Sequence, residues 1–263
     1  TNGRWADVIT VFAKVDGDKF TAFFFFKGMT GVSYGAEEKK MGIKGSNTVV
    51  LNLDNVQVPV ENVLGDVGKG HKIAFNVLNI GRWKLGAATL GGCKRVLIEV
   101  TKYVQERKQF GKAISEFGMI RKKIADCVTR TFALESMSYR IAGLYDEAIA
   151  KLDKNDAQYD QRCIEAIEDF AIEASIAKVY GSEALWASAD DGVQAFGGFG
   201  FSAEYPMEAM QRDSRINRIF EGTNEINRLI IPGTLLKRAM AGKIPLMESI
   251  QTVLGELKAG FQN

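Results

Sequence analysis

The sequence predicts an α+β protein in which a partial antiparallel β-domain is followed by an up-and-down four-helix bundle. Apolar residues alternate with a period of two over roughly the first sixty residues and change to the helical period at about Lys69. The helical patterns are long and the joins between them are short, which is typical of a bundle. A chain of 263 residues is long enough to build a core in one large or two smaller domains.

The composition excludes several classes of protein. An apolar fraction of 46% and a charged fraction of 25% are those of an ordinary soluble protein and exclude disorder. With 34 basic and 32 acidic residues, nothing favours nucleic acid or an anionic membrane as a partner. No apolar run approaches the ~20 residues of a membrane span. The opening segment also lacks the layout of a signal peptide.

The cysteines and the histidine predict no metal site. Cys93, Cys127 and Cys163 are far apart in helical patterns, so they form neither a metal pair nor a disulfide framework. We expect them to be core residues in a reducing compartment. The single histidine, His71, has no partner motif for a zinc site or a catalytic triad and is expected on the surface near a helix start.

The first strands are predicted from an Asp-Gly pair. The segment ADVITVFAKV ends at Asp16-Gly17, a signal for a two-residue hairpin loop, and the very apolar segment FTAFFFF returns directly after it. The chain begins one residue before a turn-like Asn-Gly pair. We therefore expect part of this sheet to be formed by chain that precedes Thr1.

A further strand is predicted in the segment TVVLNLDNVQVPV. Three apolar residues there share one face: Val49, Leu51 and Leu53. The pattern then resets to Val56 and Val58, and Pro59 ends the pairing because proline has no N–H to donate. The sheet is expected to stop near Leu64.

One long amphipathic helix is predicted between residues 120 and 148. Apolar residues recur there every seven positions, and a second set follows four residues after each, so that together they form one stripe. The two sets are Ile120, Cys127, Leu134, Ile141 and Ala148, and Ile124, Thr131, Ser138 and Tyr145. Similar patterns predict helices over residues 73–106 and 164–188, and the polar segment KLDKNDAQYD is an exposed connection.

A last helix is predicted after the glycine-rich, aromatic segment DDGVQAFGGFGFSAEY. Its apolar face is marked by Ile226, Leu229 and Ile230. We expect Thr223 to cap its N-terminus and Pro232 to bend or break it.

Three segments carry residues suited to chemistry: YVQERKQFGKAI, VQAFGGFGFSAEYP and RIFEGTNEINRLII. In the last segment Glu221 directly follows two large apolar residues, and a carboxylate that loses hydration is suited to proton transfer; the alternative is a solvated loop acid. Arg107 offers a planar fork for phosphate oxygens at a helix end, and the alternative is one charge on a solvated face. The glycines of GGFG let a backbone approach a ligand closely, although such a cluster is as often a helix stop.

Together, in this order and spacing, the three segments resemble the acyl-CoA dehydrogenase family. The resemblance runs from the opening TNG, through MGIKGSNTVVLNLDNVQVPVENVLG, to about Met240. The motifs GRW at 81–83 and EFG at 116–118, with the tail after the last helix, are more similar to the very-long-chain branch than to the medium-chain branch.

The resemblance also implies a division into domains. The family has an N-terminal helical domain, a middle β-domain and a C-terminal four-helix bundle. This chain is expected to lack the first domain and part of the second. Residues 1–66 then correspond to the C-terminal part of the middle β-domain, residues 67–242 to the bundle, and residues 243–263 to the start of a C-terminal extension.

The resemblance assigns Glu221 as the catalytic base, in the family's EGT motif. Some members supply the base from the position before the arginine of the first bundle helix, but here that position is Gly81, which has no side chain to act. Gly222 matches a substrate-contacting position. Asn79 and Arg82 lie where the family lines the thioester end of the acyl pocket.

The resemblance implies FAD as the cofactor and a dimer that shares its site. Thr223 and Glu225 match flavin-contacting positions beyond the base, and Thr1 matches a threonine that hydrogen-bonds the flavin ring. Glu225 and Gly118 each replace a glutamine that is frequent in the family, and the tryptophan expected before Thr1 is not present. The positions that hold the flavin of the neighbouring subunit are matched by Arg107, Phe110, Gln194, Gly197 and Gly198.

The implied function is flavin-dependent α,β-dehydrogenation of fatty acyl-CoA thioesters to trans-2-enoyl-CoA in fatty acid β-oxidation. The implied electron acceptor is electron-transfer flavoprotein, the implied assembly a homodimer or homotetramer, and the implied location the cytoplasm of a bacterium or the matrix side of a mitochondrion. Two alternatives stay open, an acyl-CoA oxidase and a non-catalytic assembly protein that binds flavin or acyl-CoA. By itself this chain is expected to be inactive, since one wall of the acyl pocket and part of the flavin platform are expected outside it.

Overall fold

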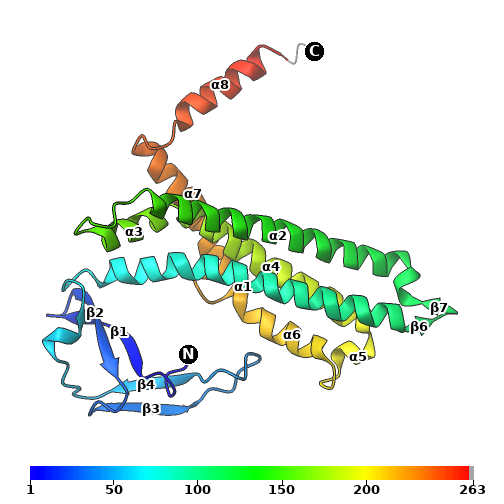
Figure 1. The fold of residues 1–263 in the computed structure, drawn as a ribbon, viewed down its shortest axis with the longest axis horizontal. Coiled ribbons are helices and arrows are strands. Elements are labelled where there is room, and N and C mark those ends of the chain that lie inside the picture. Colours follow the sequence, from blue (N-terminus) through cyan, green and yellow to red (C-terminus); the bar gives the residue numbers. More distant parts are fainter. Residues whose placement is uncertain (261–263) are drawn as a thin grey trace.

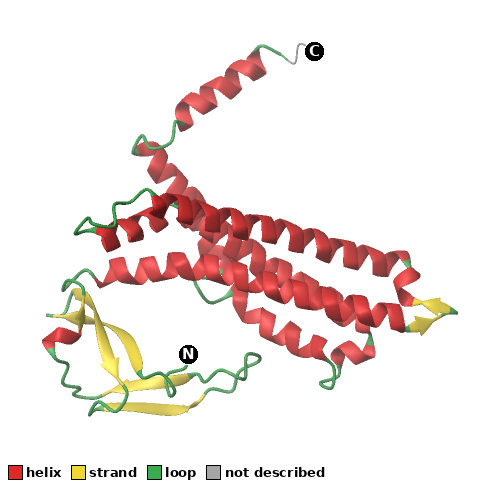
Figure 2. Ribbon diagram, viewed as in Figure 1, coloured by secondary structure: helices red, strands yellow, loops and turns green. Residues whose placement is uncertain are grey.

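The computed structural model describes residues 1–260, which form a β part at one end of a set of long helices (Figures 1 and 2). The β part contains two small antiparallel sheets, β1-β2-β5 and β3-β4. Their strands are β1 (Val8–Val15), β2 (Lys19–Phe26), β3 (Val32–Glu37), β4 (Val49–Leu53) and β5 (Val63–Leu64), with the short helix η1 (Val60–Asn62) before β5.

The predicted hairpin is confirmed, but its loop is one residue longer than expected. Val15 pairs with Lys19, which leaves three residues, 16–18, in the loop. Asp16 and Gly17 both have positive φ angles, 52° and 84°, and turn the chain through the left-handed region. The sheet ends at Leu64, as predicted, where β5 pairs with β2.

The second sheet differs from the expectation in two ways. Strand β3 was not predicted from the sequence, and it gives β4 an antiparallel partner in a separate sheet. In β4 the predicted common face is only partly buried, because Val49 and Leu51 are half-buried whereas Leu53 is 42% exposed.

The first two long helices match the predicted patterns. They are α1 (Gly70–Glu106) and α2 (Gly118–Ala150), joined by the small hairpin β6 (Lys108–Gln109) and β7 (Lys112–Ala113) and by η2 (Ile114–Glu116). The buried residues of α2 all belong to the predicted stripe: Cys127, Thr131, Leu134, Ser138, Ile141 and Tyr145. Cys93 also lies in the core, whereas Cys163 is only half-buried, contrary to expectation.

The third predicted helix is wrong as a single element. The chain forms α3 (Tyr159–Glu168) and α4 (Ala171–Phe196), with a break at residues 169–170. At the break, the Arg238 guanidinium donates to the backbone carbonyls of Asp169 at 2.7 Å and Glu168 at 3.4 Å. Carbonyls at a helix end need such donors, so a residue 69 positions away stabilises the break.

Helix α4 is the centre of the bundle. It contacts α1, α2, α6 and α7, and the chain reverses direction between α1, α2 and α4 (Figure 1). Two glycines bring α1 and α4 close together. A Cβ at Gly86 would lie 2.9 Å from the carbonyl oxygen of Ala177, and one at Gly181 would lie 2.4 Å from Oγ1 of Thr89. This close approach brings the Ala177 turn of α4 directly against α1.

After α4 the chain turns back along that helix through α5 (Gly198–Phe201), α6 (Pro206–Ser214) and η3 (Arg215–Arg218). Helix α7 (Asn224–Met240) then packs on α4, and α8 (Leu246–Lys258) projects away from the bundle (Figure 1). We predicted that Pro232 would bend or break the last helix. Helix α7 continues past Pro232 to Met240, so the helix is not broken there. Helix α8 is exposed along most of its length, and residues 261–263 of the predicted extension lie outside the described residues.

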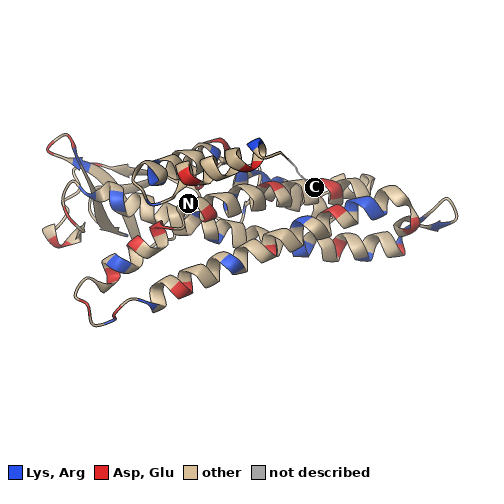
Figure 3. Ribbon diagram, turned by 90° about the horizontal axis from the view of Figure 1, so that it is seen from above, with Lys and Arg blue, Asp and Glu red and all other residues tan. Residues whose placement is uncertain are grey.

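Charged residues of both signs are interspersed along the helices (Figure 3). No helix within residues 1–260 combines the length and the apolar character that crossing a membrane requires.

Candidate functional site

Glu221 lies in the short loop between η3 and α7, in a backbone conformation that few residues adopt. Its φ angle is 59° and that of Gly222 is 78°, so two successive residues are in the left-handed region. The Oε2 atom of Glu221 is buried and has no hydrogen-bond partner in the part of the chain that is described. A buried, unpartnered carboxylate oxygen costs free energy, which marks a functional site rather than a structural one.

The backbone of α1 forms the surface against which this carboxylate lies. A Cβ at Gly81 would be 2.5 Å from Oε2 and 2.9 Å from Cδ of Glu221, closer than real Cβ atoms come. The absence of a side chain at Gly81 therefore gives the carboxylate its place. The expected walls, Ile219 and Phe220, are 47% and 39% exposed, so within this chain they do not enclose the acid.

Asn79 and Arg82 lie beside the same loop, and both are 6% exposed. The Arg82 Nη1 donates to Asn79 Oδ1 at 3.0 Å, and its Nε points at the Glu221 carbonyl oxygen at 3.4 Å. Burial lowers the pKa of Arg82, and the nearby Glu221 charge opposes that effect. Among residues 1–260 no carboxylate forms a salt bridge with this guanidinium, so Glu221 is its nearest compensating charge.

A buried lysine below the loop was missed by the sequence analysis. Lys178 on α4 is 0% exposed, and its Nζ donates to the Gly222 carbonyl and to Asn224 Oδ1, both at 2.7 Å. Asn227 Nδ2 donates to the carbonyls of Gly222 at 2.8 Å and Thr223 at 3.0 Å. The only sequence signal was a lysine within an otherwise small and apolar helix segment, ASIAKVYGS, where a charge is out of pattern.

Thr223 caps α7, as predicted. Its Oγ1 accepts a hydrogen bond from the Ile226 N–H at 3.3 Å. Glu225 is exposed in the first turn, and hydrogen bonds from its own backbone N–H and from Thr223 lower the pKa of its carboxyl. The cap fixes the direction in which the chain leaves the Glu221 loop.

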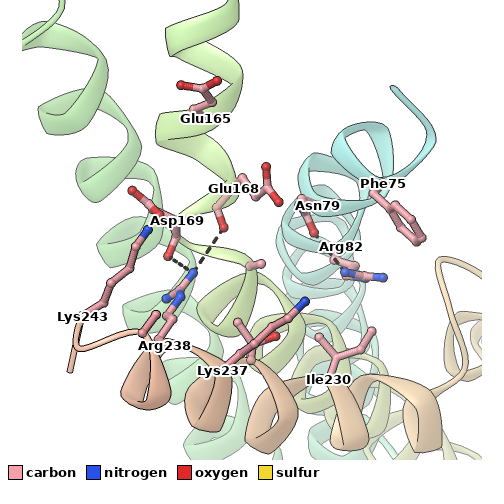
Figure 4. A pocket seen from close by; sticks show the side chains of 13 residues that line it. Phe75, Asn79, Arg82, Glu165, Glu168, Asp169, Ile230, Lys237, Arg238 and Lys243 are labelled. Atoms are coloured by element: carbon pink, nitrogen blue, oxygen red, sulfur yellow. Dashed lines mark hydrogen bonds between the residues drawn. The ribbon is translucent and has the colours of Figure 1, made fainter. Parts of the chain in front are cut away.

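A groove of about 900 Å³ opens next to this cluster, between α1, α3 and α7 (Figure 4). Asn79 and Arg82 reach it from α1, while Lys237 and Arg238 line it from α7. Its lining is rich in charged side chains, which suit a polar ligand better than an alkyl chain. The charged lining residues are Arg82, Glu165, Glu168, Asp169, Lys237, Arg238 and Lys243.

The other predicted residues gather at the far end of α1. A hollow of about 380 Å³ there is lined by Arg107, Gly197 and Gly198, together with the rings of Tyr103 and Phe199. The Arg107 guanidinium carbon lies 5.9 Å from the centre of the Phe199 ring. Phe110 is 90% exposed at the tip of the β6–β7 hairpin. Gln194 is exposed on the last turn of α4, three residues before Gly197.

The structure thus brings the predicted residues together in two separate groups. One group consists of Glu221, Gly222, Asn79 and Arg82, with Thr223 and Glu225 at the start of α7. The other is Arg107, Phe110, Gln194, Gly197 and Gly198. Arg82 and Arg107 are 25 positions apart on α1, which at about 1.5 Å per residue is about 37 Å.

Thr1 belongs to neither group. It is exposed at the N-terminal end of the β part, and within residues 1–260 no hydrogen bond joins it to either group (Figure 1).

A small β region precedes a helical bundle in which a glutamate is held on a left-handed turn beside a bundle helix. Residues 68–236 match the family described as acyl-CoA dehydrogenase, C-terminal domain. The chain belongs to the acyl-CoA dehydrogenase family, which confirms the resemblance seen in the sequence and the fold class that it implied.

Two relatives illustrate the match in sequence. The chain is 51% identical over 257 residues to a probable acyl-CoA dehydrogenase of Bacillus subtilis, a match that covers 98% of this chain and 43% of the relative. It is 40% identical over 240 residues to the human mitochondrial very long-chain specific acyl-CoA dehydrogenase, covering 88% of this chain and 34% of that enzyme. The identity to the short-chain specific enzyme of Megasphaera elsdenii is 36%, in line with the predicted likeness to the very-long-chain branch.

Solved structures give the same result. An acyl-CoA dehydrogenase from Bacillus anthracis complexed with FAD has a TM-score of 0.96 and 50% identity, with 98% of this chain and 44% of that chain covered. Butyryl-CoA dehydrogenase from Megasphaera elsdenii has a TM-score of 0.79 and 37% identity, covering 90% of this chain and 58% of that chain. The chain thus spans less than half the length of the Bacillus proteins that it matches.

The buried Lys178 predicts a pH dependence of stability. Burial lowers the pKa of this ammonium from 10.5 to about 8, so between these values the folded protein binds fewer protons than the unfolded chain. Its contribution to the free energy of unfolding is therefore least favourable below pH 8 and rises as the pH increases from about 8 to 10.5. In urea titrations between about pH 8 and 10.5, we expect the unfolding free energy of the parent to increase relative to that of Lys178→Met. Parallel curves for the two proteins would contradict a depressed pKa.

Proposed function

We propose that this chain provides the catalytic base and part of the flavin-binding surface of an enzyme that dehydrogenates fatty acyl-CoA thioesters to trans-2-enoyl-CoA. The observation that carries the proposal is the Glu221 carboxylate, held against Gly81 with an unpartnered buried oxygen. A base must have a free lone pair and a fixed direction, and Oε2 has both. The Glu221 carboxylate takes the α-proton of the thioester.

The same loop supplies a place for the charge that develops on the thioester oxygen. The carbonyls of residues 221–223 all face donors from the bundle: Arg82, Lys178 and Asn227. Within residues 1–260, the Glu221 N–H donates to no protein acceptor. A free N–H beside the base is suited to bind the thioester oxygen and to stabilise an enolate-like charge. Arg82 and Asn79 form the polar end of the acyl pocket, next to the thioester.

The hollow at the far end of α1 would bind the phosphate and adenine part of an FAD. The Arg107 fork suits phosphate oxygens, the rings of Tyr103 and Phe199 suit an adenine, and the glycines at 197 and 198 let the backbone come close. When bound, the flavin supplies the acceptor for the β-hydrogen, which leaves as hydride. The FAD complex of the Bacillus anthracis relative supports this cofactor.

A dimer explains why the two groups of residues are far apart. A span of about 37 Å along a rigid helix prevents Glu221 and Arg107 of one chain from meeting at the same reacting centre. We infer that Arg107, Phe110, Gln194, Gly197 and Gly198 hold the flavin that serves the partner's Glu221 in a homodimer, or in a homotetramer built from such dimers.

The proposed setting is fatty acid β-oxidation, with electron-transfer flavoprotein as the electron acceptor. A chain in the structure of the electron-transferring flavoprotein of Acidaminococcus fermentans matches with a TM-score of 0.79 and 35% identity. We propose that residues 1–66 belong to a middle β-domain and residues 67–242 to the bundle. The protein would act in the bacterial cytoplasm or, in a eukaryote, on the matrix side of the mitochondrion.

The first test replaces Glu221 with glutamine in the flavin-loaded full-length protein. Glutamine keeps the backbone N–H and the shape but cannot accept the α-proton, and a positioned base is worth about 10² to 10⁴ in rate. Anaerobic bleaching of the flavin by acyl-CoA should slow by that factor, while acyl-CoA binding survives. A variant that bleaches at the parental rate would show that Glu221 is not the base. Hydrogen peroxide formed in air at the turnover rate would favour an oxidase instead, and a parent that never bleaches would favour the assembly protein.

The second test adds one methyl group at Gly81. In Gly81→Ala the new Cβ would lie 2.5 Å from Oε2, so the carboxylate must move. A misplaced base costs about 10²-fold in rate, and we expect slower bleaching with unchanged flavin content. Gly91→Ala is the matched control, because Gly91 is on the same helix and a Cβ there meets no atom within 4 Å. If both variants bleach at the parental rate, Gly81 does not position the base.

The third test concerns Arg107. Arg107→Ala should weaken flavin retention more than it slows the chemistry, since a charge-assisted hydrogen bond is worth about 1.5 to 3 kcal/mol, or about 10- to 150-fold in affinity. The measurement is flavin content after dialysis, with Lys108→Ala as a neighbouring control of equal charge. Equal flavin content in Arg107→Ala and in the parent would contradict the assignment.

A further inference from the structure

We propose that Lys178 is a positioning residue for the base, and that its ammonium holds the Glu221–Gly222 turn in the conformation that aims the Glu221 carboxylate. This inference rests on the proposed function. It gives a role to a buried charge that neither the binding of FAD nor the proton transfer itself uses.

The contacts of the Lys178 ammonium define that role. Nζ donates at 2.7 Å to the carbonyl of Gly222, the residue that follows the base, and at 2.7 Å to Asn224 Oδ1. Asn224 is held in turn by Ser182 Oγ at 3.0 Å and by Glu183 Oε1 at 3.1 Å. The lysine thus joins α4 to both ends of the junction between the Glu221 loop and α7.

The position of this charge is unusual because no carboxylate neutralises it directly. Within residues 1–260, Lys178 forms no salt bridge, whereas Lys123 and Arg130 both pair with Asp191. A buried charge without such a partner is costly, and an apolar residue of similar size would be easier to bury. The cost is understandable if the ammonium is needed at this carbonyl, since a charged donor makes a stronger hydrogen bond than a neutral one.

The turn requires an external hold. Glu221 is not glycine, yet its φ angle of 59° lies in the left-handed region, which persists only where the surroundings determine it. Donors converge on residues 221–223 from three helices: Arg82 on α1, Lys178 on α4 and Asn227 on α7. Of these, Arg82 and Asn227 approach the Glu221 carbonyl only at 3.4 and 3.5 Å. Lys178 and Asn227 both donate to the next carbonyl, that of Gly222, at 2.7 and 2.8 Å, and Lys178 is the charged donor of the two.

The first experiment measures the hold itself, without any substrate. In Lys178→Met, backbone amides of residues 219–224 should exchange with solvent about tenfold faster, while those in the middle of α1 and α4 keep their protection. Ser182→Ala is the matched control, since Ser182 is on the same helix, is also 0% exposed and contacts Asn224 but not the loop carbonyls. Lys178→Met alone leaves the buried Asn224 amide without the lysine as a donor. If that variant does not fold, the double variant Lys178→Met/Asn224→Leu removes this amide together with the lysine, so that it is not left buried without its partner.

The second experiment measures the consequence for the base in the flavin-loaded protein. At saturating acyl-CoA, Lys178→Met should bleach the flavin at least about tenfold more slowly, because a misplaced base loses rate while the binding contacts remain. The dissociation constant for the enoyl-CoA product should change less than the rate does. The isotope effect of α-deuterated substrate on bleaching should increase, because removal of the α-proton then limits the rate more fully. A merely structural role would lower the amount of active protein without changing that isotope effect.

The outcomes separate this inference from the proposed function. Loop exchange and isotope effect both equal to those of the parent would overturn the role of Lys178, even if Glu221→Gln abolishes bleaching. Faster loop exchange in a protein whose parent never bleaches its flavin would support the hold on the loop and refute the dehydrogenation. A similar loss in Ser182→Ala and Lys178→Met would also count against Lys178, because it would assign the effect to general packing of α4.

Discussion

The arrangement depends on one constraint, which is that two successive residues of the Glu221 loop stay in the left-handed region. An ordinary loop would relax out of this conformation, so the surrounding helices have to supply donors to its carbonyls. They do so with buried polar side chains from three helices, and this explains why Arg82, Lys178 and Asn227 lie where a bundle would otherwise place apolar residues. The close crossing of α1 and α4 at Gly86 and Gly181 lies next to Lys178, which reaches the loop from the same part of α4.

Much of the fold could be predicted from periodicity. The heptad stripe of α2 and the hairpin signal at Asp16-Gly17 identified their elements because each depends on local sequence. The break between α3 and α4 could not be predicted, since the apolar pattern continues across it and its stabilising donor, Arg238, comes from a distant helix. Strand β3 was missed because its partner strand, and not its own sequence, defines it. Pro232 in α7 shows the opposite error, where a strong local rule was overridden by the rest of the helix.

For the candidate site, the sequence identified the residues suited to chemistry but not the buried residues that hold the Glu221 loop in place. Glu221, Arg82 and Arg107 were found because their motifs recur in a known family. Lys178 and Asn227 donate to backbone carbonyls of the Glu221 loop, and the lysine is 44 positions away from the carbonyl that it contacts. No spacing rule connects residues so far apart. Ile219 and Phe220 precede the acid in sequence but do not enclose it within this chain, and the surface that meets the carboxylate is a glycine on another helix.

The length of α1 has its own consequence. This single unbroken helix carries Gly81 and Arg82 near one end and leads to Arg107 at the other. It therefore fixes the distance and the relative orientation of the two groups of residues. Deleting one residue between the two groups would shorten the helix by about 1.5 Å and rotate the residues after the deletion by about 100° about the helix axis. A gap of one residue in this helix would therefore disturb the geometry more than most substitutions. The exposed connection at residues 151–158 can vary in length without altering the spacing of either group. Changes in chain length among related sequences should accordingly gather in that connection and be absent between residues 82 and 107.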